Sequence, residues 1–178
     1  MFENNSDIIK PLLLVSPDQP SKMRKHCNEL AKDLSNKVRK RLPDSSKTLF
    51  VFVLRGAMFL YPAFVNEFED ASFCFTHKDY VTKLECVQFE TVVIVDTLVN
   101  SGNVISNVKK LILKTVNTKK LYLAVVFSNK NVKENLCENF DEVFCLLYMD
   151  TVSILVDVGA AFTNGNGIDK PKNYLIHQ

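Results

Sequence analysis

The chain has 178 residues and a formal net charge of +2; 47% of its residues are hydrophobic and 24% are charged. A chain of this length can bury a sizeable core, and this composition excludes a largely disordered protein. The nearly balanced charge does not by itself indicate a nucleic-acid partner. No apolar run approaches the roughly 20 residues of a membrane span, and the first residues lack the pattern of a signal peptide. We therefore expect a single globular domain over residues 1–178 with no membrane partner.

The cysteines and histidines add a second constraint. The five cysteines are odd in number and form no CxxC pair, and the three histidines are too scattered to suggest a metal site. Buried, reduced thiols in a cytoplasmic protein are the simplest interpretation. The cysteines are Cys27, Cys74, Cys86, Cys137 and Cys145.

The first expected helix is strongly basic. Residues 1–20 contain three prolines and are expected to form an N-terminal arm, after which Ser21 is a suitable N-cap for a helix over 21–42. Apolar residues at a spacing of three or four give this helix one buried face. Its eight cations are Lys22, Arg24, Lys25, Lys32, Lys37, Arg39, Lys40 and Arg41, against the acids Glu29 and Asp33.

The rest of the chain alternates between apolar runs and helical patterns. Strands are expected at 48–54, 72–76, 91–95, 120–127 and 142–149, and helices at about 58–68, 103–114 and 131–140. Residues 77–90 read as mostly loop with a possible short strand, and 153–158 as a last strand or helix. This alternation predicts an α/β fold with a mostly parallel central sheet and helices on both faces.

Three of the expected strand ends carry polar or glycine-rich segments, and ligands bind at the carboxyl ends of such strands. The first segment begins at Arg55. In the second, the strand is expected to stop at Asp96, after which a polar loop leads to Ser101 and Gly102 at a helix start, where backbone N–H groups can hold an anion. The third is the glycine-rich stretch 165–167. A sugar phosphate with an attached base would suit all three segments.

These segments resemble motifs of the uracil phosphoribosyltransferases, within the type I phosphoribosyltransferase superfamily. VLRGAMFL is similar to the pyrophosphate loop of that family, VVIVDTLVNSG to its aliphatic-strand and Asp-Pro-Met-Leu-Ala-Thr-Gly signature, and FTNGNGID to its uracil-binding segment. The resemblance implies a phosphoribosyltransferase-type fold and catalytic roles for Arg55 and Asp96. It also implies a ribose-phosphate loop of Thr97, Asn100, Ser101, Gly102 and Asn103, and a base pocket with Gly165, Gly167 and Asp169.

The resemblance further implies a reaction and its cofactor. Members of the family transfer ribose 5-phosphate from phosphoribosyl pyrophosphate to uracil with Mg²⁺, giving UMP and pyrophosphate in pyrimidine salvage. It also suggests a homodimer and a bound nucleotide or phosphoribosyl pyrophosphate.

Departures from the family pattern bear on activity. Asn103 and Val104 stand where the family has glycine and a hydroxyl residue, and Asn164 replaces a proline. The long catalytic loop of the family is shortened to residues 77–90. Whether the chain is an enzyme therefore stays open, and the sequence favours transfer activity that is reduced or lost.

The alternative is a non-enzymatic binding or inhibitory module on the same scaffold. Such a module could dock on a large RNA–protein assembly, such as the ribosome, through the cations of helix 21–42. A second basic region comprises Lys109, Lys110, Lys114, Lys119 and Lys120. An ordinary solvated helix face is the more common explanation of such basic residues.

Overall fold

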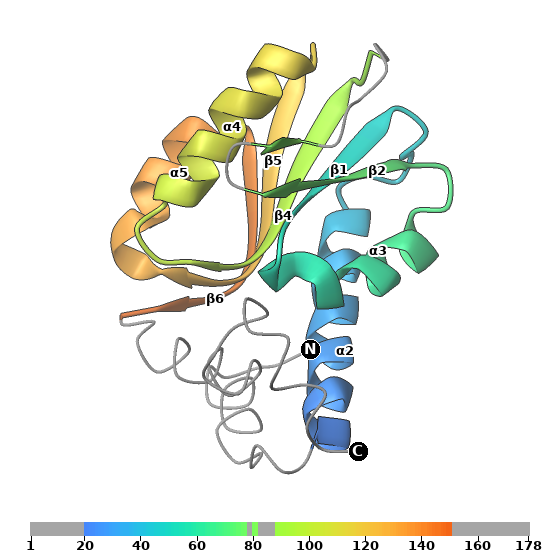
Figure 1. Cartoon of the computed structure of the whole chain (residues 1–178), viewed down its shortest axis with the longest axis vertical. Helices are drawn as coiled ribbons and strands as arrows, with labels where there is room; N and C mark the ends of the chain where they lie inside the picture. Colours follow the sequence, from blue (N-terminus) through green and yellow to red (C-terminus); the bar gives the residue numbers. More distant parts are fainter. Residues whose placement is uncertain (1–19, 78–79, 82–87, 151–178) are drawn as a thin grey trace.

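A six-stranded sheet forms the centre of the molecule (Figure 1). The computed structural model describes residues 20–77, 80–81 and 88–150. The strands are β1 (Thr48–Val53), β2 (Ser72–His77), β3 (Tyr80–Val81), β4 (Thr91–Val99), β5 (Lys120–Asn129) and β6 (Glu142–Met149), in the order β3-β2-β1-β4-β5-β6. Five strands are parallel and only the two-residue β3 is antiparallel. The predicted α/β fold with a mostly parallel sheet is confirmed.

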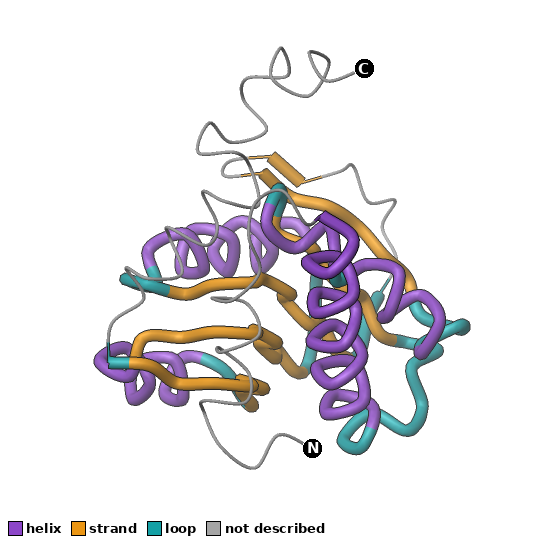
Figure 2. The backbone as a smooth tube through the Cα atoms, turned by 90° about the horizontal axis from the view of Figure 1, so that it is seen from below, coloured by secondary structure: helices purple, strands orange, loops and turns teal. Residues whose placement is uncertain are grey.

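Helices cover both faces of the sheet (Figures 1 and 2). The helical segments are α2 (Pro20–Arg39), η1 (Gly56–Phe59), α3 (Tyr61–Glu67), α4 (Asn103–Thr115), η2 (Lys130–Val132) and α5 (Lys133–Asn139). Helices α2 and α3 pack on one face, and α4 and α5 on the other. The spacing of Ile105, Val108 and Ile112 explains why α4 buries one side, since residues three or four apart share a helix face.

The alternation of strand residues divides the core into two layers. In β1 the side chains of Phe50 and Phe52 point to the α2–α3 layer, whereas those of Leu49 and Val51 point to the α4–α5 layer. All six residues of β1 are buried, as expected for a central parallel strand covered on both faces. The ring of Phe50 lies 5.3 Å from that of Phe64 in an edge-on contact, so an aromatic cluster anchors α3 to the sheet.

Several cations of the predicted basic helix contact other elements of the fold. The helix ends at Arg39 rather than at residue 42. The ammonium group of Lys37 donates a 2.7 Å hydrogen bond to the backbone carbonyl of Cys145 on β6. Arg41 pairs with Glu142 at 2.7 Å, and Arg39 lies over an aromatic ring of the α3 layer at 5.0 Å. These three cations are therefore engaged within the protein.

Two further expectations are wrong. Strand β4 does not stop at Asp96 but continues to Val99, because the long, buried β5 offers Phe127 and Ser128 as partners for its last residues. Cys137 is exposed on α5 although Cys27, Cys74 and Cys145 are buried as expected. Burial raises the pKa of each of these three thiols to about 12.

Other expectations fall outside the described residues: most of the N-terminal arm, the lid remnant around 82–87, Cys86, the element at 153–158 and the segment containing Asn164. Within the part of the chain that the structure describes, no helix combines the length and hydropathy needed to cross a bilayer.

Candidate functional site

The strand order identifies one edge of the sheet as the natural place for a ligand. From β1 the chain moves to β2 on one side, and it then returns to β4 on the other side of β1. The carboxyl ends of β1 and β4 therefore flank a topological switch point, where α/β sheets bind ligands in the crevice between diverging loops. Arg55 follows the end of β1, and Asp96 lies in β4 at this same edge.

The turn after β1 lies directly against β4. A Cβ atom added to Gly56 would be 3.2 Å from the Thr97 hydroxyl oxygen and 3.5 Å from Asp96 Oδ1. A glycine at this position thus allows a close approach that a side chain would crowd. The preceding Arg55, at the start of η1, is half-buried, and the Leu54–Arg55 peptide bond is cis. The structure brings three of the predicted site residues (Arg55, Asp96 and Thr97) to one place.

Asp96 is a buried carboxyl group supported by backbone donors. Its residue is 9% exposed, and the Thr97 N–H donates to Oδ1 at 2.7 Å. Burial raises the pKa of Asp96 to about 7, because desolvation disfavours the charged carboxylate more than the backbone N–H groups of Thr97 and Leu98 stabilise it. The group can therefore exchange its proton near neutral pH and still has lone pairs for the hydroxyl groups of a ligand.

The neighbouring Thr97 hydroxyl is buried, and no described residue forms a hydrogen bond with it. Native proteins leave few buried polar atoms unsatisfied, and each one requires an explanation such as a water molecule or a ligand. At the switch point, next to the Gly56 turn, this hydroxyl is available to a ligand.

The loop between β4 and α4 is short and suited to an anion. Gly102 has φ 78° and ψ −5°, a left-handed conformation that favours glycine, and its carbonyl accepts the first bond of α4 from the Ser106 N–H at 2.9 Å. The Asn103 N–H reaches the Ser101 hydroxyl only at 3.5 Å. The first turn of α4 contains no acid, so its N–H groups and helix dipole favour a negative ligand.

Asn129, at the end of β5, is a residue that the sequence prediction missed. Its amide donates to Asn100 Oδ1 at 3.4 Å and its own Oδ1 accepts from the Asn131 N–H at 2.9 Å. It thereby links the predicted loop residue Asn100 to the next strand. The available signal was its position, since Asn129 follows the long apolar run of β5 just as Asp96 follows that of β4.

The remaining predicted site residues are not placed. Gly165, Gly167 and Asp169, the expected base pocket, lie outside the described residues. Within the described ranges no three His, Cys, Asp or Glu side chains come together in a way that could hold a metal ion.

Comparisons with known proteins agree with this geometry at the level of the fold. No protein-family model matches the chain, and no curated protein sequence matches it. The AQ2163 protein of Aquifex aeolicus has a similar structure, with a TM-score of 0.69 and 16% identity over 94% of this chain and 99% of that one.

Two solved phosphoribosyltransferases are also similar. A hypoxanthine-guanine phosphoribosyltransferase of Bacillus anthracis gives a TM-score of 0.52 at 15% identity, covering 77% of this chain and 83% of its own. A purine phosphoribosyltransferase of Pyrococcus horikoshii gives 0.51 at 16% identity, covering 69% and 87%. At these identities the likeness shows the fold alone. The chain thus has the α/β fold of phosphoribosyltransferases.

Proposed function

We propose that this chain is a uracil phosphoribosyltransferase-like protein that binds a ribose 5-phosphate group at the β1–β4 edge, with transfer activity that is reduced or lost. The observation that carries the proposal is the close approach of Gly56 to Asp96 and Thr97 at the switch point, on the strand that leads to the left-handed turn at Gly102. A ribose phosphate needs hydroxyl acceptors and an anion site within a few ångströms of each other. This edge combines both.

Each group has a distinct part in the proposed site. The Asp96 carboxylate accepts hydrogen bonds from ribose hydroxyls, and the Thr97 hydroxyl gains the partner that it lacks. The loop from Asn100 to Asn103, including Ser101, holds the 5′-phosphate with backbone N–H groups at the start of α4. Arg55 follows β1 at the same edge of the sheet, and we assign its guanidinium group the role of attracting a departing pyrophosphate.

Reduced activity follows from what the reaction requires. The transition state resembles an oxocarbenium ion with a leaving pyrophosphate, and it needs fixed charges and exclusion of water. Val104 is 51% exposed at the start of α4 and offers no hydroxyl donor to the phosphate. Mg²⁺, if used, would neutralise the pyrophosphate charge. In this proposal the ion would enter bound to the phosphate groups of the substrate.

Purified protein should first be assayed for ligand binding and then for turnover. We expect UMP to bind and to raise the melting temperature, while transfer from phosphoribosyl pyrophosphate to uracil in the presence of Mg²⁺ is slow or undetectable. Hypoxanthine and guanine serve as competing bases, since the two named enzymes of similar fold act on purines. Turnover with a purine base but not with uracil would overturn the uracil assignment.

Asp96→Asn tests the site itself. The variant should lose UMP binding and any turnover, because the amide keeps the shape of the side chain but lacks the charged acceptor. Asp70→Asn is the matched control, since Asp70 is exposed just before β2 at the opposite edge of the sheet. Equal UMP affinity in both variants would refute the proposed ribose site.

The alternative function is docking on a large RNA–protein assembly. It needs cationic side chains that are exposed and not engaged within the protein. Lys37, Arg39 and Arg41 are engaged internally, so their reversal would also perturb folding. Arg24 and Lys25 are exposed and suit the test better. If α2 docks on ribosomes, reversal of these two charges should abolish salt-sensitive co-sedimentation. Unchanged co-sedimentation would exclude this use of the helix.

A further inference from the structure

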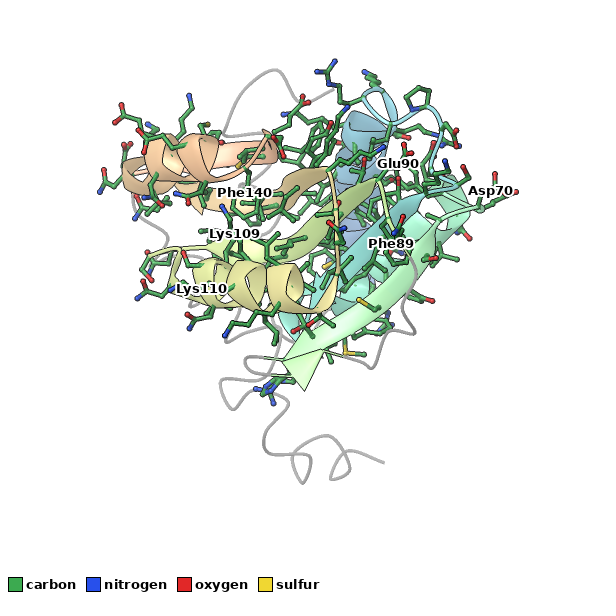
Figure 3. All side chains as sticks on the ribbon, turned by 90° about the horizontal axis from the view of Figure 1, so that it is seen from above. Asp70, Phe89, Glu90, Lys109, Lys110 and Phe140 are labelled. Carbon is green, nitrogen blue, oxygen red and sulfur yellow. The ribbon has the colours of Figure 1, made fainter. Side chains whose placement is uncertain are left out.

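A second hollow lies at the other edge of the sheet, where the strands begin. It has a volume of about 180 Å³ and is formed by the segments that precede β1, β4 and β5. Figure 3 looks onto this side of the molecule and labels Phe89 and Glu90. Since β4 spans nine residues at about 3.3 Å each, roughly 30 Å separate this hollow from the ribose-phosphate loop. We call it the amino-edge cavity; it is lined by Lys47, Gln88, Phe89, Glu90, Asn117, Thr118 and Lys119.

Backbone hydrogen bonds fix the walls of the amino-edge cavity. The Glu90 N–H donates to the Lys47 carbonyl at 3.0 Å, and the Glu90 carbonyl accepts from the N–H groups of Lys119 and Lys120 at 3.2 and 3.1 Å. The Thr118 hydroxyl donates to the same Glu90 carbonyl at 3.2 Å. Three separate segments are thus joined through one residue, so the cavity is part of the fold rather than a gap between loose side chains.

Positive charge exceeds negative charge at the rim. Lys47 and Lys119 both approach the same carboxylate oxygen of Glu90, at 3.3 and 3.4 Å. Charge-assisted bonds are usually about 2.7–2.9 Å, so neither ammonium group is bonded at its preferred distance. Each ammonium carries three donors, and one carboxylate cannot satisfy six. The hydrogen bond from Lys47 is the main cause that lowers the pKa of Glu90, and the charge of Lys119 adds to it. The Glu90 carboxylate therefore stays charged.

Two amide side chains beside these lysines also retain free hydrogen-bonding groups. Within the described part of the chain, neither Gln88 nor Asn117 makes a side-chain hydrogen bond, although both line the cavity. Phe89 is only 7% exposed and gives the cavity an apolar lining. The result is a half-open hollow with unsatisfied donors from two ammonium groups and two amides.

We propose that the amino-edge cavity binds a compact anion that carries a phosphate or carboxylate group, between the ammonium groups of Lys47 and Lys119. A volume of about 180 Å³ has room for an oxyanion together with a few water molecules. The anion competes with Glu90 for the two ammonium groups and accepts further hydrogen bonds from the amides of Gln88 and Asn117. It does not share residues with the ribose-phosphate site.

The sign of the Glu90→Gln effect is the decisive test. Backbone amide spectra of the full chain are recorded while inorganic phosphate is added at constant ionic strength, with acetate in a parallel series and chloride as the reference. We expect saturable shifts at the amides of Glu90 and Lys119. Glu90→Gln should tighten phosphate binding about fivefold, because it removes the carboxylate that competes for the two ammonium groups.

Two lysine variants and one control complete the experiment. Lys47→Gln and Lys119→Gln should each weaken binding about fivefold. Lys114→Gln removes the same charge from an exposed position on α4 that does not line the cavity, and it should leave the affinity unchanged. Stronger binding of acetate than of phosphate would assign the cavity to carboxylates.

Three results would overturn the proposal: shifts that do not saturate, weaker binding in Glu90→Gln, or an equal loss in Lys114→Gln. The last would indicate general attraction to lysines. All three side chains changed at the rim are more than half exposed, so the variants should fold, and their amide spectra show directly whether they do.

Discussion

Replacing Asp96 by asparagine should stabilise the protein at pH 8. The unfolded chain releases the Asp96 proton near pH 4, whereas the native protein keeps it until about pH 7 because the carboxyl group is buried. Between these values the native state binds more protons than the unfolded state, so the stability of the wild type falls as the pH rises and is constant above pH 7. The asparagine side chain does not ionise, so the variant does not lose stability in this way as the pH rises.

The magnitude follows from the size of the pKa change. Raising a carboxyl pKa from 3.8 to about 7 costs the ionised native state about 4 kcal/mol at pH 8, at about 1.4 kcal/mol per pH unit. At pH 5 the same relation gives about 1.7 kcal/mol. The protonated carboxyl and the amide have nearly the same shape and hydrogen-bonding groups, so the two proteins should be similarly stable near pH 4.

Urea unfolding of wild type and Asp96→Asn at pH 5, 6, 7 and 8 measures this difference, with Asp70→Asn as the exposed control. The free energy of unfolding of the variant should exceed that of the wild type by an amount that grows with pH. A difference that stays constant from pH 5 to pH 8 would refute the reasoning, because it would mean that Asp96 ionises alike in the folded and unfolded states.

Three further variants probe the turn, the core and the attachment of α2. Gly102→Ala should cost about 1 kcal/mol in urea unfolding, since φ 78° is unfavourable for alanine, and it should weaken UMP binding in calorimetry. Phe50→Ala removes a fully buried ring and should cost about 3–5 kcal/mol, and a loss below 1 kcal/mol would mean that the site collapses around the smaller residue. Lys37→Ala breaks the 2.7 Å bond to the Cys145 carbonyl and should cost about 1 kcal/mol, with faster amide exchange where α2 meets β6 if the bond anchors the helix.

The sequence predicts the layers of the fold because buried parallel strands leave a plain signal. Runs such as those of β1 and β4 are apolar throughout, and the helices between them show one apolar face. The end of β4 was less predictable, since Val99 stays in the sheet through its pairing with Ser128 on β5. Such pairing is a tertiary contact, and the sequence of residues around Asp96 does not indicate it.

The residue types of the candidate site could be predicted from the sequence, but the pKa of Asp96 and the hydrogen bonding of Thr97 could not. An acid after an aliphatic run and a Ser-Gly pair before a helix identify Asp96 and Gly102 from sequence alone. The raised pKa depends on burial by several elements, and the unpartnered hydroxyl of Thr97 depends on the turn at Gly56, about 40 residues earlier in the sequence. Contacts between such distant segments determine both properties, so a reading of local motifs cannot supply them.

The energetics of the β1–β4 edge bear on the proposed ribose-phosphate site. The fold tolerates a buried carboxyl group at Asp96 and a buried hydroxyl group without a partner at Thr97, and each is unfavourable in a protein without a ligand. A module that docks through the outer face of α2 gains nothing from either group. A ribose hydroxyl bound at this edge would donate to the Asp96 carboxylate and give Thr97 a partner. The same two groups that lower stability would then strengthen binding, which is the exchange of stability for function expected at a working site.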